Sequence, residues 1–366
     1  MLRFHSLQVA QINPDAEDAI AISLQVPEDL RGEYCGLAGQ HIVVRAQIGE
    51  EEIRRTYSLV NAPGEWPLRI VARIHPAGRM SRHLAEQVRA GDRLDVLPPN
   101  GSFTPRLASR KPGSYVAFAA GCGITPVLSI ASALLKADAG NRFALFYGNA
   151  STARTMCLEE LLALKDRYLE RLSLHFVMSR EPQEVELYNG RVDLAKVRQL
   201  AQTFFRPEAV TEYFVCGPGD MIDRVSATLR ELGVESERIH SEHFTMDTVS
   251  DQVRGAAAVH GVAVDPGVAH GDSCAEVTII MDGRRRSFTM PMNDESVLDA
   301  ASRAGIELPF SCRAGVCSTC RTKVVRGEVE MAQNYALEEW ELEQGYVLAC
   351  QARVKTPQLE LDYDDK

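Results

Sequence analysis

Three cysteines stand close together in the segment PFSCRAGVCSTC, towards the C-terminal end of the sequence. Cys312, Cys317 and Cys320 have the spacing C-x4-C-x2-C, and Cys350 follows in GYVLACQARV. This is the spacing with which four thiolates hold two irons. Ala314, Gly315, Ser318 and Thr319 between the cysteines are small, which lets backbone N–H groups reach the sulfurs. The pattern predicts a [2Fe-2S] centre with these four ligands.

Zinc is the alternative metal, because it also takes four thiolates. Structural zinc sites usually combine two C-x2-C pairs, whereas only one pair in this segment has that spacing. Cysteines without a ligand role would be scattered along the chain, as Cys35, Cys157 and Cys274 are. The spacing therefore favours the iron–sulfur centre.

The segments around the cysteines predict a small domain. AEVTIIMDGRRRSFTMP alternates apolar and polar residues around Asp282-Gly283, which predicts a hairpin. DESVLDAASRAGIEL predicts a helix that ends at Gly305, and RTKVVRGEVEM predicts a second hairpin. Together with the cysteine spacing, this order resembles the β-grasp (α+β) fold of plant-type ferredoxins over residues 275–366.

A second group of candidate residues lies in EEIRRTYSLVNAPG. Arg55 offers a cation for a phosphate, Tyr57 a flat ring, and Ser58 a hydroxyl for a ring nitrogen. The preceding segment predicts strands of an antiparallel barrel. A helix beginning near Met80 and Ser81, after a glycine turn, would present its N-terminus to a phosphate.

These features resemble the flavin domain of the ferredoxin–NADP reductase superfamily. The resemblance implies that Arg55 holds the flavin phosphate, that Tyr57 packs on the isoalloxazine ring and that Ser58 reaches N5. It further implies that Met80 and Ser81 bind the pyrophosphate of FAD.

The next segment, SYVAFAAGCGITPVLSIASALL, predicts a buried strand, a glycine turn and a helix. Gly121 and Gly123 would let a dinucleotide approach the backbone, and Thr125-Pro126 suits the first helical turn. Further strands alternate with helices, which predicts an α/β domain whose parallel sheet binds its ligand at the carboxyl ends of the strands.

The strings G-x-G-I-T-P, Y-G-N, S-R-E and C-G-P match the superfamily's nicotinamide domain in order. The resemblance adds these nicotinamide-site candidates: Ser179, Arg180, Cys216, Gly217, Pro218 and Met221. Ser179 and Arg180 favour the 2′-phosphate of NADPH. The adjoining Glu181 leaves NADH open, because acids in this position bind ribose hydroxyls.

Four candidates for the reactive face of the flavin follow from the same resemblance: Ser58, Tyr57, Cys216 and Phe244. Glu242 matches an acid in the same region. A redox or nucleophilic role for the Cys122 and Cys216 thiols is the alternative to shaping the nicotinamide pocket. Phe244 could equally be a core residue.

Composition limits the class of protein. The 366 residues carry a net charge of −10, which argues against nucleic acid as a partner. No apolar run reaches the ~18–20 residues of a membrane helix, and the N-terminus shows no secretion signal. An odd number of cysteines without an export signal disfavours disulfides. We expect a cytoplasmic protein that acts without a membrane.

We therefore expect a multidomain chain: an FAD-binding barrel over residues 1–108, an NAD(P)-binding domain over 109–245, a flexible linker over 246–274 and a ferredoxin domain over 275–366. This domain order resembles that of oxygenase reductases. Long matching segments, among them LPFSCRAGVCSTC and NYALEEWELEQGYVLACQA, resemble the reductase subunits of phenylacetyl-CoA epoxidase complexes.

That resemblance implies electron transfer from NADPH through FAD and the [2Fe-2S] cluster to a di-iron oxygenase that epoxidises phenylacetyl-CoA. Reductases of Rieske-type or other aromatic-ring oxygenases are the alternative. An electron carrier with a vestigial flavin site, or a zinc-stapled interaction module fused to a diaphorase, are hypotheses from other classes.

One charged segment is a candidate docking face. Glu338, Glu339, Glu341 and Glu343 crowd together before Cys350. They could steer a basic partner onto the ferredoxin domain, although a solvated acidic helix is an equally good interpretation.

Overall fold

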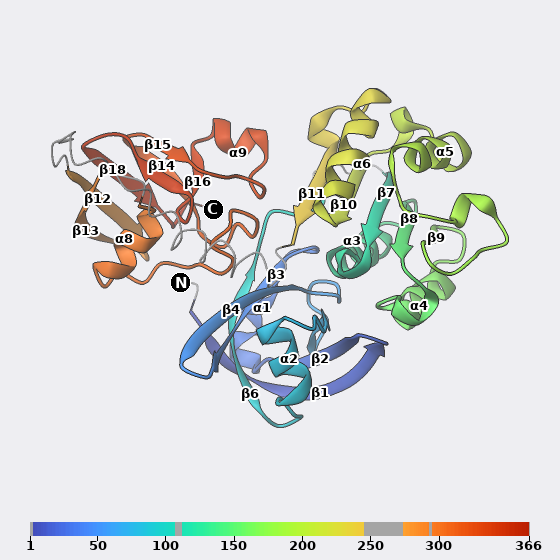
Figure 1. Ribbon diagram of the computed structural model, residues 1–366, viewed down its shortest axis with the longest axis horizontal. Helices are drawn as coiled ribbons and strands as arrows, with labels where there is room; N and C mark the ends of the chain where they lie inside the picture. Colours follow the sequence, from blue (N-terminus) through green and yellow to red (C-terminus); the bar gives the residue numbers. More distant parts are fainter. Residues whose placement is uncertain (1–2, 107–111, 245–273, 293–294, 366) are drawn as a thin grey trace. The chain divides into compact units, whose positions relative to one another are not determined.

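The computed structural model describes residues 3–106, 112–244, 274–292 and 295–365. The chain forms two compact units, Phe4–Phe244 and Thr245–Lys366, the latter together with Met1–Arg3. Figure 1 shows the helices and strands of both units, coloured along the sequence. The expected linker falls outside the described residues except for Cys274, which already begins a strand. No helix in the described ranges is long and apolar enough to cross a membrane.

The first half of the Phe4–Phe244 unit is an antiparallel barrel, as expected. Its sheet has the order β4-β3-β6-β1-β2-β5, and a bridge between Leu59 and Ile70 joins the two ends of the sheet. Alternate residues such as Ile42 and Val44 fill its interior. The elements are β1 (His5–Ala16), β2 (Ala19–Gln25), α1 (Arg31–Tyr34), β3 (His41–Ile48), β4 (Glu51–Ser58), β5 (Leu68–Arg73), α2 (Arg79–Glu86) and β6 (Arg93–Asn100).

The second half of this unit is the expected α/β domain. Its five strands are all parallel, in the order β11-β10-β7-β8-β9. The elements are β7 (Ser114–Ala120), α3 (Ile124–Ala137), β8 (Arg142–Asn149), α4 (Leu158–Arg167), β9 (Leu172–Met178), α5 (Leu194–Phe204), β10 (Glu212–Gly217), α6 (Gly219–Glu231) and β11 (Ile239–His243).

Helices cover both faces of the parallel sheet, so its strands are apolar on both sides. Along β7, Ala117 packs into the core shared with α3 and α4, whereas Val116 and Phe118 pack into the core shared with α5 and α6. This explains why the segment SYVAFAA is a continuous apolar run. Because helices cover both faces, a ligand can reach this sheet only at the ends of its strands.

The Thr245–Lys366 unit contains a sheet of order β13-β12-β18-β14-β16 and a small β15-β17 pair. The buried face of α8 contributes to the core of this sheet. The elements are β12 (Cys274–Met281), β13 (Arg284–Pro291), α8 (Val297–Arg303), β14 (Arg321–Arg326), β15 (Val329–Met331), α9 (Glu339–Glu343), β16 (Tyr346–Leu348), β17 (Ala352–Val354) and β18 (Gln358–Asp362).

The local sequence explains the first hairpin and the helix of this unit. Asp282 and Gly283 have φ of 56° and 67°, as a two-residue hairpin turn requires. Ser296 caps α8 by accepting the Asp299 N–H, and Gly305 at φ 74° follows the helix, as predicted.

The second predicted hairpin, over RTKVVRGEVEM, is wrong. Strand β14 pairs with β16 and β18, while β15 pairs with β17. At Gly327 the backbone has φ of 89°, and a Cβ there would lie 2.2 Å from the Gln358 oxygen. The glycine is thus required by a close approach to another strand, which the local pattern cannot distinguish from a hairpin turn.

A half-buried histidine on the edge strand β9 has a consequence for stability. The His175 ring stacks on Phe146 with centroids 4.9 Å apart, and its Nδ1 lies 3.0 Å from the Tyr188 hydroxyl. Burial, followed by the charge of Lys165, lowers the pKa of His175 from 6.5 to about 4. The folded state therefore holds His175 neutral where the unfolded chain already takes up a proton.

This difference predicts an acid-side loss of stability. As pH falls from the unfolded pKa of 6.5 towards the folded pKa of about 4, protonation of the unfolded state lowers the free energy of unfolding. Urea unfolding of the wild type and of His175→Gln, at pH 7.5 and at pH 5, measures this contribution. We expect the wild type to lose more stability than the variant between the two pH values, and equal losses would contradict it.

Candidate functional site

Strand β4 carries the first candidate group. Arg55 and Tyr57 are two residues apart, so their side chains start on the same face of the strand. Tyr57 packs against the edge of the barrel core and is half-buried. Arg55 donates to the Arg54 carbonyl at 2.9 Å. A cation and an aromatic ring thus lie in line along one strand face, an arrangement suited to a flavin with its phosphate.

Ser58 faces the other way and belongs to a buried polar group. Its Oγ donates to Oε2 of Glu242 at 3.4 Å, and Nδ1 of His41 lies 3.6 Å from Oε1 of the same carboxylate. The exposed fractions are 4% for Ser58, 2% for His41 and 9% for Glu242. Glu242 belongs to β11, so this contact joins the α/β half to the barrel.

The sequence did not single out His41. The feature that could have identified His41 is strand pairing, because His41 lies directly opposite Ser58 in the β3–β4 ladder. Gly101 completes the site, since a Cβ there would lie 2.9 Å from Nδ1 of His41.

A second contact between the barrel and the α/β half was also not predicted from the sequence. Arg73 donates through Nη1 to both oxygens of Asp18 at 2.7 Å, and Arg154 forms an ion pair with the same carboxylate. Nη2 of Arg73 also donates to the Arg154 carbonyl. Arg73 further comes within 3.9 Å of the Cβ position of Gly121. A barrel strand is thereby held next to the glycine turn of the α/β half.

The helix α2 is placed as expected, but its two candidate residues are buried. Met80 is fully inside the barrel core, and Ser81 accepts a hydrogen bond from the His75 N–H at 3.2 Å. Gly78 precedes the helix, and no described side chain caps its first turn. Any anion bound there would meet backbone N–H groups rather than the Met80 side chain.

The glycine turn after β7 contains the candidate coenzyme residues Gly121 and Gly123 and packs against the end of β10. Gly121 has φ of 54°, and a Cβ on Gly123 would lie 2.1 Å from the Cys216 carbonyl oxygen. The Thr125 hydroxyl donates to the Cys122 carbonyl at 3.0 Å, and Pro126 lies in the first turn of α3. The turn is therefore packed tightly against the end of β10.

The C-G-P string ends β10 and opens α6. Cys216 is fully buried, and a Cβ on Gly217 would lie 2.9 Å from the Met221 methyl group. Pro218 is the residue before α6. Burial raises the pKa of the Cys216 thiol, and also that of Cys122. Both thiols stay protonated at neutral pH, which disfavours the alternative that they act as nucleophiles.

The S-R-E string follows β9. The Ser179 hydroxyl donates to the Asn149 carbonyl at 3.2 Å, and Arg180 is exposed. Glu181 accepts both the N–H and the O–H of Thr152, at 2.7 and 2.6 Å, and these bonds lower its pKa. The Glu181 carboxylate, which kept NADH as an alternative coenzyme, is thus hydrogen-bonded to a neighbouring turn. The Arg180 side chain is exposed to solvent.

Phe244 is the last described residue of the first unit. It directly follows β11 and packs, partly buried, against the core that contains Cys216 and Phe214. Its position agrees with both interpretations given above, a ring near the ligand edge and a core residue.

In the second unit the four candidate cysteines lie together as two pairs. Cys312 pairs with Cys317, and Cys320 pairs with Cys350, each through a sulfur–sulfur hydrogen bond. The hydrogen bond from Cys317 lowers the pKa of Cys312 to about 6, and the bond with Cys320 lowers that of Cys350. No three His, Cys, Asp or Glu side chains surround a single ion within the described ranges. Two irons with two cysteines each would fit the two pairs.

Polar hydrogens are directed at these sulfurs. The Ala314 N–H donates to Sγ of Cys312 at 3.4 Å, and Nε2 of Gln351 donates to Sγ of Cys350 at 3.5 Å. Arg313 and Ser318 hold left-handed φ angles of 55° and 48°, which wind the loop around its sulfurs. Thiolates need such donors when they are buried, so the residues present fit an iron–sulfur centre.

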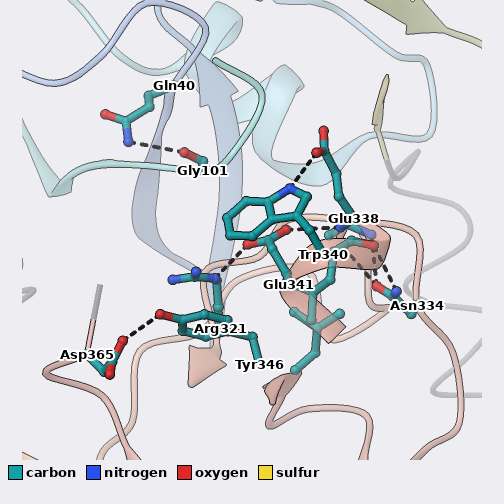
Figure 2. Close-up of polar contacts among 12 residues, drawn as sticks. Gln40, Gly101, Arg321, Asn334, Glu338, Trp340, Glu341, Tyr346 and Asp365 are labelled. Carbon is teal, nitrogen blue, oxygen red and sulfur yellow. Dashed lines mark hydrogen bonds and ion pairs between the residues drawn. The ribbon is translucent and has the colours of Figure 1, made fainter. Parts of the chain in front are cut away.

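The expected acidic face is smaller than the sequence suggested. Glu341 is only 1% exposed and accepts from Nε of Arg321 at 2.8 Å (Figure 2). It also accepts the Glu338 N–H at 3.0 Å, and the Trp340 indole donates to Glu338 at 2.7 Å. Its position on the inner side of α9 makes Glu341 a structural anchor, so it is not part of a docking face.

Comparisons with known proteins agree with this geometry. Three family models match: an oxidoreductase FAD-binding domain over residues 9–104, an oxidoreductase NAD-binding domain over 118–227 and a 2Fe-2S iron-sulfur cluster binding domain over 279–355. The chain is 37% identical to one of the subunits of the 1,2-phenylacetyl-CoA epoxidase of Escherichia coli (strain K12), over 100% of this chain and 99% of that protein.

Two further proteins extend the comparison. A 3-ketosteroid-9-alpha-monooxygenase ferredoxin reductase component of Rhodococcus rhodochrous is 30% identical, over 98% of this chain and 96% of that one. The solved phthalate dioxygenase reductase has a TM-score of 0.56 at 24% identity, over 98% of both chains, and shares the fold.

The chain belongs to the ferredoxin–NADP reductase superfamily, in the group of reductases that carry a C-terminal plant-type [2Fe-2S] domain. It is an oxidoreductase that uses FAD, NAD(P)H and a [2Fe-2S] cluster. FAD, when bound, would supply the conversion of a two-electron hydride donor into the single electrons that an iron–sulfur centre accepts.

The cysteine pairs generate a direct prediction. Removing one ligand by Cys350→Ser should abolish iron–sulfur absorbance and bound iron, because the second iron loses half of its protein thiolates. Flavin reduction by NADPH should continue at the wild-type rate, since the flavin candidates lie in the other compact unit. Iron analysis and anaerobic spectra measure both effects.

Cys274→Ser is the matched control, because Cys274 is an exposed cysteine of the same unit outside both pairs. It should keep full iron content. Retention of iron–sulfur absorbance by Cys350→Ser would contradict the assignment of the fourth ligand.

Proposed function

We propose that this chain is the reductase component that delivers electrons from NADPH, through FAD and the [2Fe-2S] cluster, to a di-iron oxygenase that epoxidises phenylacetyl-CoA. The end-to-end similarity to the Escherichia coli epoxidase component carries the proposal. The oxygenase is a separate partner in a multicomponent complex located in the cytoplasm. Neither nucleic acid nor a membrane is a partner.

The residue roles belong to this proposal. Arg55 binds the flavin phosphate, Tyr57 packs on the ring, and Ser58 reaches its reactive nitrogen with Glu242 and His41 behind it. The turn of α2 at Met80 and Ser81 binds the pyrophosphate. The nicotinamide coenzyme is held by Gly121, Gly123, Thr125, Pro126, Ser179, Arg180, Cys216, Gly217, Pro218 and Met221. Phe244 borders the reactive face. The domains are an FAD-binding barrel over residues 1–108, an NAD(P)-binding domain over 109–245 and a ferredoxin domain that begins with the strand at Cys274.

The alternative acceptor is a Rieske-type or other aromatic-ring oxygenase. The 30% identity to the 3-ketosteroid-9-alpha-monooxygenase component, over nearly the whole of both chains, favours it as the second candidate.

Reconstitution distinguishes the two acceptors. The holoprotein is mixed with NADPH, oxygen and either the oxygenase component and substrate of a phenylacetyl-CoA epoxidase or those of a Rieske oxygenase. We expect product that depends on the reductase, with coupled NADPH consumption, in the first mixture. Turnover in the second mixture alone, with an equally active flavin and cluster, would contradict the proposed acceptor.

The coenzyme preference generates a second test. If the exposed Arg180 binds the 2′-phosphate, Arg180→Gln should lower kcat/KM for NADPH by about tenfold or more, the scale of one charge-assisted hydrogen bond. The value for NADH should be unchanged, since NADH lacks that phosphate. Steady-state kinetics with both coenzymes and an artificial acceptor provide the measurement.

Arg167→Gln, at an exposed arginine of α4, is the control for a general change of surface charge. An equal loss with NADPH and NADH in Arg180→Gln, or no loss with either, would rule out a phosphate-binding role.

A further inference from the structure

Two buried hydroxyl groups near the cysteine pairs have no hydrogen-bond partner among the described atoms. They are the Oγ of Ser311 and the hydroxyl oxygen of Tyr363. Ser311 directly precedes the ligand Cys312. A buried hydroxyl without a partner costs about 1–3 kcal/mol, so each needs an explanation.

Tyr363 is held in place from several directions. Its N–H donates to the Ile280 carbonyl at 2.9 Å, directly after β18. The next residue, Asp364, accepts the N–H groups of Asp282 and Gly283 at 2.8 Å. The backbone on both sides of the ring is thereby fixed to the β12–β13 turn.

The strand register places Tyr363 near the cysteine end of β14. Asp362 pairs with Lys323, and the Asp362 carbonyl accepts the hydroxyl of Thr322, two residues after Cys320, at 2.9 Å. The Tyr363 ring packs against the buried cluster of side chains that includes Cys320 and Cys350. The ring is partly exposed, whereas its hydroxyl oxygen is buried. The polar end of the side chain therefore points inward, the reverse of the usual orientation of a tyrosine at a protein surface.

The Tyr363 phenol carries its proton at neutral pH, because the ordinary pKa of tyrosine is about 10. It is therefore a hydrogen-bond donor on the side of the core that contains the sulfurs of Cys320 and Cys350. Neither sulfur accepts its hydrogen in the structure. A phenylalanine would fill the same space without the cost of a buried hydroxyl.

We propose that the Tyr363 hydroxyl donates a hydrogen bond to a sulfur of the [2Fe-2S] centre on its Cys320–Cys350 side and raises the reduction potential of that centre. The reduced centre is more negative than the oxidised one, so a donor to sulfur stabilises the reduced form more. Tyr363 is a positioning and tuning residue rather than a ligand. Ser311 is the corresponding hydroxyl beside the Cys312–Cys317 pair.

The test is a potentiometric titration of full-length Tyr363→Phe holoprotein, followed by visible absorbance and electron paramagnetic resonance. We expect the equilibrium constant for one-electron reduction of the cluster to fall by about tenfold, which is ~59 mV in midpoint potential. The flavin potential should be unchanged. A midpoint potential equal to that of the wild type, with intact cluster absorbance, would overturn the proposal.

Tyr346→Phe is the matched control. The Tyr346 hydroxyl donates to Asp365 (Figure 2), so its loss should leave the cluster potential unchanged. If Tyr363→Phe fails to retain a cluster, the wild type labelled with 3-fluorotyrosine replaces it. The more acidic phenol is a stronger donor and should raise the cluster potential, and an unchanged potential would overturn the proposal.

Discussion

The buried carboxylate of Glu242 is the contact on which the reductase unit depends. A carboxylate removed from water is costly unless charge or hydrogen bonds compensate it. Here Ser58 and His41, from two strands of the barrel, supply the compensation to a strand of the α/β half. Because flavin and nicotinamide sites belong to different halves, their alignment requires such a contact. The Asp18–Arg73–Arg154 group holds the same two halves at a second point.

In the iron–sulfur unit, buried sulfur atoms need compensating hydrogen-bond donors, as the buried carboxylate of Glu242 does. Its four thiols are largely buried, and backbone and side-chain N–H groups are aimed at them. Left-handed residues in the cysteine loop bring these donors into position at a cost in backbone energy. The α9 helix is anchored next to this loop, since Glu341 binds Arg321, the residue after Cys320. The ion pair between Glu341 and Arg321 therefore connects α9 to the first residue of β14, next to the ligand loop.

The sequence predicted features whose signal is local. Four cysteines at a defined spacing, a strand ending in R-x-Y-S and glycine turns after apolar strands all depend on neighbouring residues, and the three-part architecture followed from them. Contacts between distant segments were not predictable in this way. His41 acquires its place only through pairing with Ser58 and contact with Glu242. The sequence pattern predicted that Glu341 is exposed, because only the fold brings its partner Arg321 next to it. The prediction of the second hairpin was wrong because Gly327 allows a close approach to the distant residue Gln358 and does not form a hairpin turn.

One chain that carries all three domains can pass electrons from NAD(P)H to flavin and then to the cluster. Anaerobic stopped-flow absorbance with one equivalent of NADPH measures this transfer. We expect flavin absorbance to bleach first and iron–sulfur absorbance to bleach next, while flavin absorbance partly recovers. Flavin bleaching with an iron–sulfur envelope that never changes would contradict it, because the two units would then not share electrons.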